Sequence, residues 1–182
     1  CTISTVSVKV YFFSNLLVFD TISLCFSKGL GCPVGSILVG NEEKINKALR
    51  IRKILGGGMR QSGYLASAAI FAIENQIEDL KKDHIKAKEI GNVLEKLNFI
   101  KKVEPVSTNI IIFSLIEEID QNYFINKMKE NNIFIISLGN NKLRIVTHRD
   151  YTDNHHNYWN HRSRWSWISI RMLMHPYLYY FV

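Results

Sequence analysis

The sequence has few cysteines and no long apolar run, and both absences limit what the protein can be. Its three cysteines are Cys1, Cys25 and Cys32, an odd number with no CxxC pair and no Cys/His spacing of a metal site. Because the spacing of a metal site is absent, we expect no bound metal. Such thiols are typical of a reduced, cytoplasmic protein. No apolar stretch reaches the roughly eighteen residues that a membrane-spanning helix needs, so we expect no membrane partner.

Acidic residues are also in deficit, with 16 against 23 lysines and arginines and a formal charge of +7. A basic protein can bind nucleic acid, but this requires basic side chains clustered on one face. Here they lie in helical stretches among acids, as over 81–89, which is typical of a solvated helix surface. We therefore expect no nucleic-acid partner. The 47% of hydrophobic residues is enough for the core of one domain or one and a half.

The first forty residues have the pattern of strands and turns. The β-branched and aromatic run Val6–Phe13 predicts one strand. The apolar run Thr21–Phe26 predicts a second strand, buried on both faces. After a glycine-rich loop, Gly35–Val39 predicts a third. The two strands around the loop should form a hairpin or lie side by side in a sheet.

Residues 41–97 have helical periodicity. Asn41 is a good N-cap for a helix that runs to Leu55 and ends at three consecutive glycines, which a helix crosses only at high cost. Over 61–97, apolar residues recur every three or four positions, which predicts one helix roughly 55 Å long that kinks or bridges two domains. His84 falls on the apolar stripe, where we expect a partly buried structural histidine.

The remaining sequence divides into a small α+β unit and an unusual end. The unit should contain two strands, a helix capped by Asp120, and two strands joined by a hairpin turn, over Val103–Val106, Asn109–Leu115, Asp120–Asn131, Ile133–Ser137 and Lys142–Thr147. Residues 151–182 hold all three tryptophans and five of the eight tyrosines, without helical or strand period. We interpret them as a non-native end. The alternative is a metal-binding tail through His155, His156 and His161.

The sharpest chemical signal is the loop Ser27-Lys28-Gly29-Leu30-Gly31. A lysine at the end of a buried strand has its amine near the sheet edge, where partial desolvation makes the amine a nucleophile. The glycines let the backbone approach a flat cofactor closely. The loop alone leaves a solvent-exposed turn lysine open as the alternative, and the GxxxxGK(S/T) order of a nucleotide-binding loop is absent.

Four segments carry a family resemblance: Phe19–Ser36 around the lysine, Gly56–Gln61, Thr108–Asn109 and Leu143–His148. Together, over about 19–150, they resemble the threonine aldolases, in the β-eliminating lyase group of pyridoxal phosphate enzymes. The resemblance implies an α/β fold, a partial fold type I of the aspartate aminotransferase-like kind, with a site shared across a homodimer or homotetramer.

The resemblance also implies roles for three residues. Lys28 should hold pyridoxal 5'-phosphate as a Schiff base and act as the catalytic lysine, Arg60 should approach the cofactor phosphate, and Arg144 should bind the substrate carboxylate with its guanidinium fork. The implied reaction cleaves a β-hydroxy amino acid to glycine and an aldehyde, with the cofactor as electron sink. A lyase acting on aromatic amino acids, or an aldolase like serine hydroxymethyltransferase, stays open.

Part of the family's site is missing. The family carries, upstream of the lysine, a His-x-Asp-Gly-Ala-Arg stretch, a ring-stacking histidine and a phosphate loop, whereas residues 1–18 contain no Asp or Arg. With the initial Cys, this indicates a fragment, the C-terminal half of such an enzyme. It is predicted to have little or no activity alone, and an inactive remnant is the alternative function. The expected parts are a large-domain remnant, a long interdomain helix, a small C-terminal α+β domain and an atypical tail, over 1–60, 61–97, 98–150 and 151–182.

Overall fold

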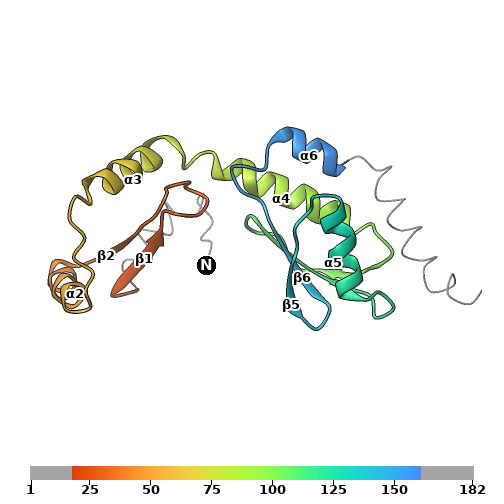
Figure 1. Ribbon diagram of the computed structural model, residues 1–182, viewed down its shortest axis with the longest axis horizontal. Helices are drawn as coiled ribbons and strands as arrows, with labels where there is room; N and C mark the ends of the chain where they lie inside the picture. Colours follow the sequence, from red (N-terminus) through yellow and green to blue (C-terminus); the bar gives the residue numbers. More distant parts are fainter. Residues whose placement is uncertain (1–17, 161–182) are drawn as a thin grey trace, which may run out of the picture. The chain divides into compact units, whose positions relative to one another are not determined.

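The computed structural model describes residues 18–160 and separates the chain into two compact units. The first unit ends at Lys82 and the second begins at Asp83. Figure 1 labels their helices and strands. The predicted strand Val6–Phe13 and residues 161–182 of the expected tail lie outside the described residues.

The first unit begins with an antiparallel hairpin, as predicted. Strand β1 (Thr21–Cys25) pairs with strand β2 (Ser36–Gly40). Helix α2 (Glu42–Ile54) follows, and its predicted cap is confirmed, because Asn41 Oδ1 accepts a hydrogen bond from Lys44 N at 2.9 Å. The glycine-rich turn thus joins the two strands, and the Asn41 cap fixes where α2 begins.

The prediction that the strand before Lys28 is buried on both faces is wrong. Strand β1 alternates exposed and half-buried residues, and β2 contains no buried residue. Ile37 and Leu38 point to opposite faces as neighbours in a strand, and each is 42% exposed. Within residues 18–160 the hairpin has no third strand beside it, so its apolar side chains lack a covering layer.

The single helix predicted over 61–97 is two helices, so that prediction is also wrong. Helix α3 spans Gly63–Asn75 and helix α4 spans Leu80–Leu94. Between them, the N–H groups of residues 80–82 donate to carbonyls of residues 77–79, three positions back instead of four, which tightens the chain into a turn. The apolar spacing runs unbroken through this turn, so the sequence hides the break. None of the helices within residues 18–160 has the length and apolar character to cross a bilayer.

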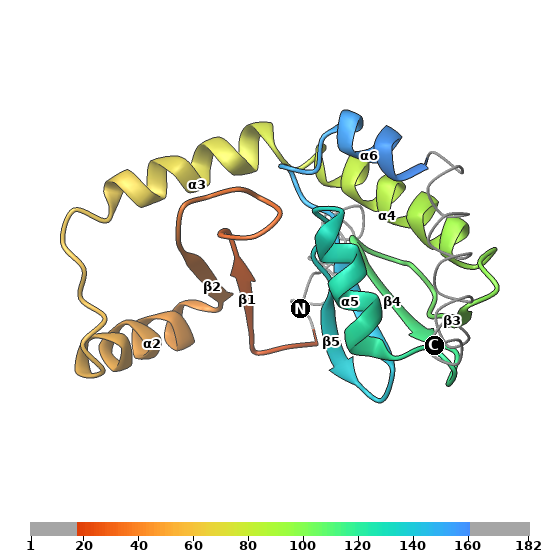
Figure 2. The same cartoon turned by 45° about the vertical axis from the view of Figure 1, so that its right-hand side comes forward.

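The second unit packs helices on one face of a four-stranded antiparallel sheet, as Figure 2 shows. The strand order is β3-β4-β6-β5, with β3 at Ile100–Val103, β4 at Ile110–Leu115, β5 at Ile136–Gly139 and β6 at Lys142–Val146. Helices α4 and α5 (Gln121–Glu130) cover the face whose alternate residues are buried. The predicted cap of α5 is confirmed by Asp120 Oδ1, which accepts from Tyr123 N at 2.7 Å. The largest fully buried side chains of this core are Phe99, Phe113 and Phe124.

Two strands lie three residues from the predicted start. Strand β3 ends before the predicted Val103–Val106 segment does, since Pro105 has no N–H for a sheet. Strand β5 begins later than the predicted Ile133–Ser137. The hairpin turn sets the register of β5 with β6. In this predicted turn, Asn140 and Asn141 have φ of 49° and 55°, as a type I′ turn requires.

Residues 153–160 form a helix, α6 (Asp153–Asn160), although the sequence shows no helical period there. Trp159 is 5% exposed and joins the core of the second unit. His156 is buried, with Nε2 at 2.5 Å from Glu89 Oε2 and Nδ1 at 3.3 Å from the Tyr151 hydroxyl. Over the described range 18–160, no three His, Cys, Asp or Glu side chains gather in the arrangement of a metal site. The contact of His156 with Glu89 joins α6 to α4.

Candidate functional site

Lys28 lies in a closed loop between β1 and β2. Two backbone hydrogen bonds of Phe26 close the loop at its base. The Phe26 N–H donates to Gly35 O at 3.0 Å, and the Phe26 carbonyl accepts from Cys32 N at 3.1 Å. Inside the loop, Gly31 N donates to Lys28 O at 2.8 Å, and the φ of 69° at Gly31 favours glycine. These bonds fix the backbone that carries the lysine.

A small core fastens the same loop to α3. Phe26 and Cys32 are each 7% exposed and pack with Ala72 of α3. The Cys32 thiol also donates to a backbone carbonyl of α3 at 3.5 Å. Beside the lysine, Gly29 lies so close to Leu80 that a Cβ there would come within 2.5 Å of Leu80 Cδ2. The loop is therefore packed against α3, and this packing fixes the position of the Lys28 backbone.

The Lys28 side chain is exposed, so the partial desolvation predicted for it is wrong in this chain. The cause is the same as for β1: the described residues provide no layer over the hairpin. No hydrogen bond or ion pair joins Lys28 Nζ to another residue within 18–160. An amine without a partner on an ordered backbone is available to react with a carbonyl compound.

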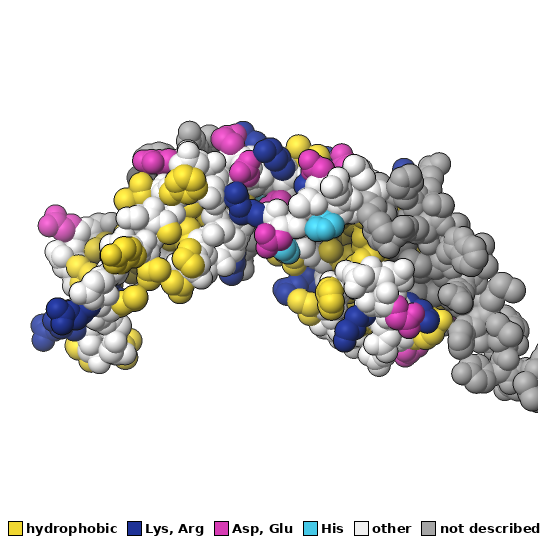
Figure 3. Space-filling view, turned by 45° about the horizontal axis from the view of Figure 1, so that its top comes forward, with side chains coloured by type: hydrophobic (Ala, Val, Ile, Leu, Met, Phe, Trp, Pro, Cys, Tyr) yellow, Lys and Arg dark blue, Asp and Glu magenta, His cyan; other side chains and the backbone are white. Residues whose placement is uncertain are grey.

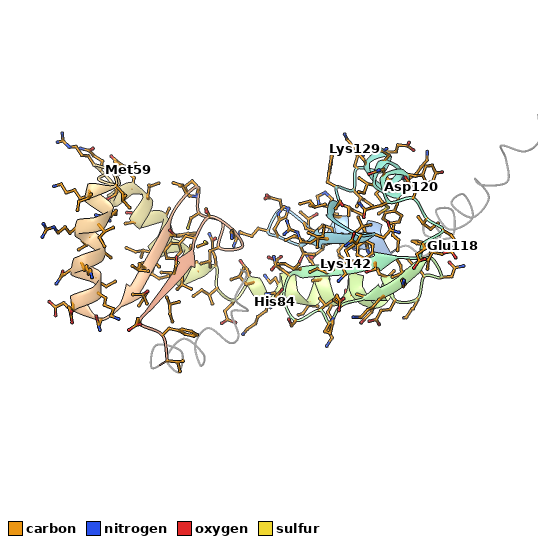
Figure 4. All side chains as sticks on the ribbon, turned by 90° about the horizontal axis from the view of Figure 1, so that it is seen from below. Met59, His84, Glu118, Asp120, Lys129 and Lys142 are labelled. Atoms are coloured by element: carbon orange, nitrogen blue, oxygen red, sulfur yellow. The ribbon has the colours of Figure 1, made fainter. Side chains whose placement is uncertain are left out.

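Arg60 follows the three glycines that end α2. The N–H groups of Gly56 and Gly57 donate to carbonyls three and five residues back, at 3.1 and 2.8 Å, and Gly56 has a φ of 83°, which together form a Schellman motif. Arg60 is exposed, as is Met59 beside it, labelled in Figure 4. Arg60 and Lys28 thus share the first unit, and no hydrogen bond joins them.

Arg144 belongs to the second unit and lies in β6. Its neighbours Leu143 and Ile145 are buried on the face that the helices cover, so Arg144 points to the other face, where its cross-strand neighbours are Ile112 and Ile136. Arg144 is half-buried, and its Nε is buried without a hydrogen-bond partner among the described residues. A buried guanidinium N–H without an acceptor suits an incoming carboxylate.

A buried polar pair fixes the end of β6, three residues after Arg144. Asn109 Nδ2 donates to Thr147 O at 2.7 Å, and Thr147 N donates to Asn109 O at 3.0 Å. The Thr147 hydroxyl donates to Asp83 O at 2.8 Å. A slip of β6 by one residue would break these bonds and turn Arg144 to the core face, so the pair positions Arg144. The sequence matched Asn109 to the family but gave it no role.

Replacing Thr147 with valine is expected to destabilise the second unit by about 1–2 kcal/mol, because the shape is kept while a buried hydrogen bond is lost. Thermal or urea unfolding followed by hydrogen exchange at β4 and β6 measures this loss. Thr21→Val, at an exposed strand threonine of the first unit, is the matched control and should leave the second unit unchanged. If Thr147→Val were as stable as the parent, the hydrogen bonds of Thr147 would not fix β6, and Thr147 would not position Arg144.

Asp83 and His84, near the start of α4, have shifted pKa values. Burial raises the pKa of Asp83 above its usual 3.8, and Lys86 is the largest of the nearby cations that oppose the shift. Burial lowers the pKa of His84 below its usual 6.5, against the opposing effect of Asp83. The expectation of a partly buried His84, labelled in Figure 4, is confirmed.

Acid is expected to destabilise the second unit through His84. Because burial lowers the pKa of His84 in the folded chain, its contribution to stability is complete above the unfolded value of 6.5 and is lost as the pH falls below it. His84→Gln removes this titration. The difference in melting temperature between variant and parent should therefore shift in favour of the variant from pH 8 to pH 5. A difference that does not change with pH would contradict the effect of burial.

Comparison with known proteins decides the family. The chain matches the family model of the beta-eliminating lyases over residues 1–118. The chain belongs to the beta-eliminating lyase family. Low-specificity L-threonine aldolase 1 of Arabidopsis thaliana is 38% identical over 136 residues, which cover 73% of this chain and 38% of that protein. The low specificity L-threonine aldolase of Escherichia coli K12 is 40% identical over 131 residues, which cover 72% of this chain and 38% of that protein. This beta-eliminating lyase chain thus spans well under half the length of the curated relatives it matches.

Solved structures confirm the predicted partial fold type I of this beta-eliminating lyase chain. A structure described as an L-allo-threonine aldolase of Listeria monocytogenes EGD-E aligns with a TM-score of 0.62 at 18% identity, over 79% of this chain and 43% of that one. The histidinol-phosphate aminotransferase of Clostridium acetobutylicum aligns with a TM-score of 0.58 at 19% identity, over 85% and 49%. At these identities the likeness shows the fold alone.

Proposed function

We propose that the chain is part of a pyridoxal 5'-phosphate-dependent lyase of the threonine aldolase type, which cleaves β-hydroxy amino acids to glycine and an aldehyde. The observation that carries the proposal is Lys28, an amine without a partner on a loop fixed at its neck. The chain around it is 38–40% identical to low-specificity L-threonine aldolases. Their names suggest L-threonine as a substrate and a place in amino acid metabolism.

The three predicted residues fit three separate tasks. Lys28 would hold the cofactor by an imine to its aldehyde carbon, on a loop whose glycines permit close approach. Arg60 would bind the cofactor phosphate. Arg144 would orient the substrate carboxylate, with its unpaired Nε–H as one donor of a bidentate pair. When bound, pyridoxal phosphate supplies the electron sink for cleavage of the Cα–Cβ bond.

Assembly and location are part of the same proposal. Arg60 would serve the cofactor of a neighbouring subunit, which requires a homodimer or homotetramer when the enzyme is complete. We expect this enzyme in the cytoplasm, with no membrane or nucleic-acid partner. Residues 1–60 would be a remnant of the large domain, 98–150 the small C-terminal domain, and 151–182 an atypical tail. The two helices over 61–97 would connect them.

An inactive remnant of such an enzyme is the second candidate. It is favoured by the exposed side chain of Lys28. The two candidates differ in whether activity returns when the rest of the fold is supplied.

The 182-residue chain, incubated alone with pyridoxal phosphate and L-threonine, is expected to release no glycine above a protein-free control. Co-expressed with the part of the E. coli relative that it does not span, hereafter the complementing segment, it is expected to release glycine and acetaldehyde in equal amounts. Release by the chain alone at the rate of the E. coli enzyme would contradict the expected incompleteness. A formed complex without any release would favour the inactive remnant.

A further inference from the structure

Arg144 has no counter-ion among residues 18–160, although acids accompany basic side chains over much of the second unit. Figure 3 shows Lys or Arg side chains beside Asp or Glu side chains on the visible face of the molecule. The lysines of the second unit in such ion pairs include Lys86, Lys101, Lys102, Lys127 and Lys142. A half-buried guanidinium normally finds acceptors for its donors, so the isolation of Arg144 needs a structural cause.

The cause lies in a row of four residues that crosses the sheet from one strand to the next. Glu104, just after β3, donates its N–H to Ile112 O of β4 at 2.8 Å. Ile112 is paired with Arg144 of β6, and Arg144 is paired in turn with Ile136 of β5. Arg144 therefore has an isoleucine on each side, and the acid comes one strand further away.

Glu104 points to the same face as Arg144, opposite the helices. Val103 before it is paired with Phe113, whose side chain is fully buried under the helices, and neighbours in a strand alternate. Strands lie about 4.8 Å apart, so the backbones of Glu104 and Arg144 are roughly 10 Å from each other, with Ile112 between them. Two side chains as long as these can meet over that span when the residue between them is small.

Two lysines compete with Arg144 for the carboxylate of Glu104. Lys102 Nζ is 2.8 Å from Glu104 Oε2, and Lys142 Nζ is 3.8 Å from Oε1. Both lysine side chains are exposed, so each of these contacts is weak. A half-buried guanidinium offers a carboxylate two parallel donors and would bind it more strongly. The lysines alone therefore do not account for the separation of Glu104 from Arg144.

We propose that Ile112 is a positioning residue, an apolar spacer that keeps Arg144 apart from Glu104 and so leaves it open to the substrate carboxylate. This inference rests on the role proposed above for Arg144. With Ile136 on the other side, Ile112 also limits the rotamers of the arginine. An ordered and unpaired guanidinium binds a carboxylate more tightly than one that must first release another acid.

Ile112→Ala is expected to raise the KM for L-threonine about 3- to 10-fold in the complex with the complementing segment, with little change in kcat. Ile112→Val keeps a branched side chain and should retain the parent KM. Adding Glu104→Gln to Ile112→Ala removes the competing charge and should restore the KM, whereas Glu104→Gln alone should leave it unchanged. An unchanged KM in Ile112→Ala, or a raised KM that Glu104→Gln does not restore, would overturn the spacer.

NMR of the Arg144 Nε–H group in the 182-residue chain tests the spacer without any need for activity. Arg144→Lys assigns the resonance by its loss. The signal should move in Ile112→Ala, as Glu104 reaches the guanidinium, and return when Glu104→Gln is added. Ile110→Ala is the matched control, since Ile110 lies on the same face of β4 opposite Val146, and it should leave the signal in place.

The two measurements separate this inference from the proposed function. A resonance that Ile112→Ala leaves unchanged, or that Ile110→Ala moves equally, would overturn the spacer. A resonance that moves as expected, in a chain whose complex releases no glycine, would support the spacer and count against the proposed function alone. Unchanged hydrogen-exchange protection in β4 checks that each variant remains folded.

Discussion

Lys28→Ala is expected to lower glycine release from L-threonine by at least about a thousandfold in the complex of the chain with the complementing segment. The amine of Lys28 is the group that would bond to the cofactor, and the loop around it holds that amine in place. Without it, the cofactor would be retained by phosphate contacts alone. The measurement is kcat/KM from the initial rate of glycine formation.

Two further variants separate chemistry from charge at this position. Lys28→Arg keeps a cation on the same loop but cannot form an imine, so it should lose as much activity as Lys28→Ala. Lys53→Ala removes another exposed lysine of the first unit and should leave kcat/KM unchanged. Substantial activity in either Lys28 variant would rule out Lys28 as the anchor of the cofactor.

Arg144→Lys is expected to raise the KM for L-threonine by about 10- to 100-fold with a smaller change in kcat. The lysine keeps the charge on the open face of β6 but loses the paired N–H donors that match a carboxylate. Steady-state kinetics over a wide range of threonine concentration measures the two constants separately.

Lys142→Ala is the matched control for Arg144. Lys142 lies on the same face of the same strand, and its Nζ is 3.8 Å from Glu104 Oε1. Because that contact is exposed, its removal should change neither constant. A fall in kcat with an unchanged KM in Arg144→Lys would show that Arg144 does not hold the carboxylate.

Local signals predicted the fold well where neighbouring residues decide the structure. The caps by Asn41 and Asp120 and the turn at Asn140 and Asn141 depend on hydrogen bonds and φ values within a few residues. The break between α3 and α4 was missed, since apolar spacing continues across residues 76–79 while the backbone tightens. The bounds of β3 and β5 are set by Pro105 and by the register of pairing with the neighbouring strand, which apolar periodicity does not encode.

The candidate site divides in the same way. Lys28, Arg60 and Arg144 could be named from the order of motifs, and their assigned roles stay predictions. The exposure of Lys28 could not be foreseen, because burial depends on which polypeptide covers the hairpin. Nor could the pairing of Asn109 with Thr147, which joins residues 38 positions apart through bonds that appear only in the folded sheet.

Borohydride reduction of the complex in the presence of pyridoxal phosphate tests the role of Lys28 most directly. Reduction converts an imine to a stable amine, so peptide mass mapping then identifies the lysine that carried the cofactor. We predict one label for each chain, on Lys28, together with an absorbance band of the imine that Lys28→Ala removes. A label on another lysine, or one spread evenly over the exposed lysines, would contradict the assignment of Lys28.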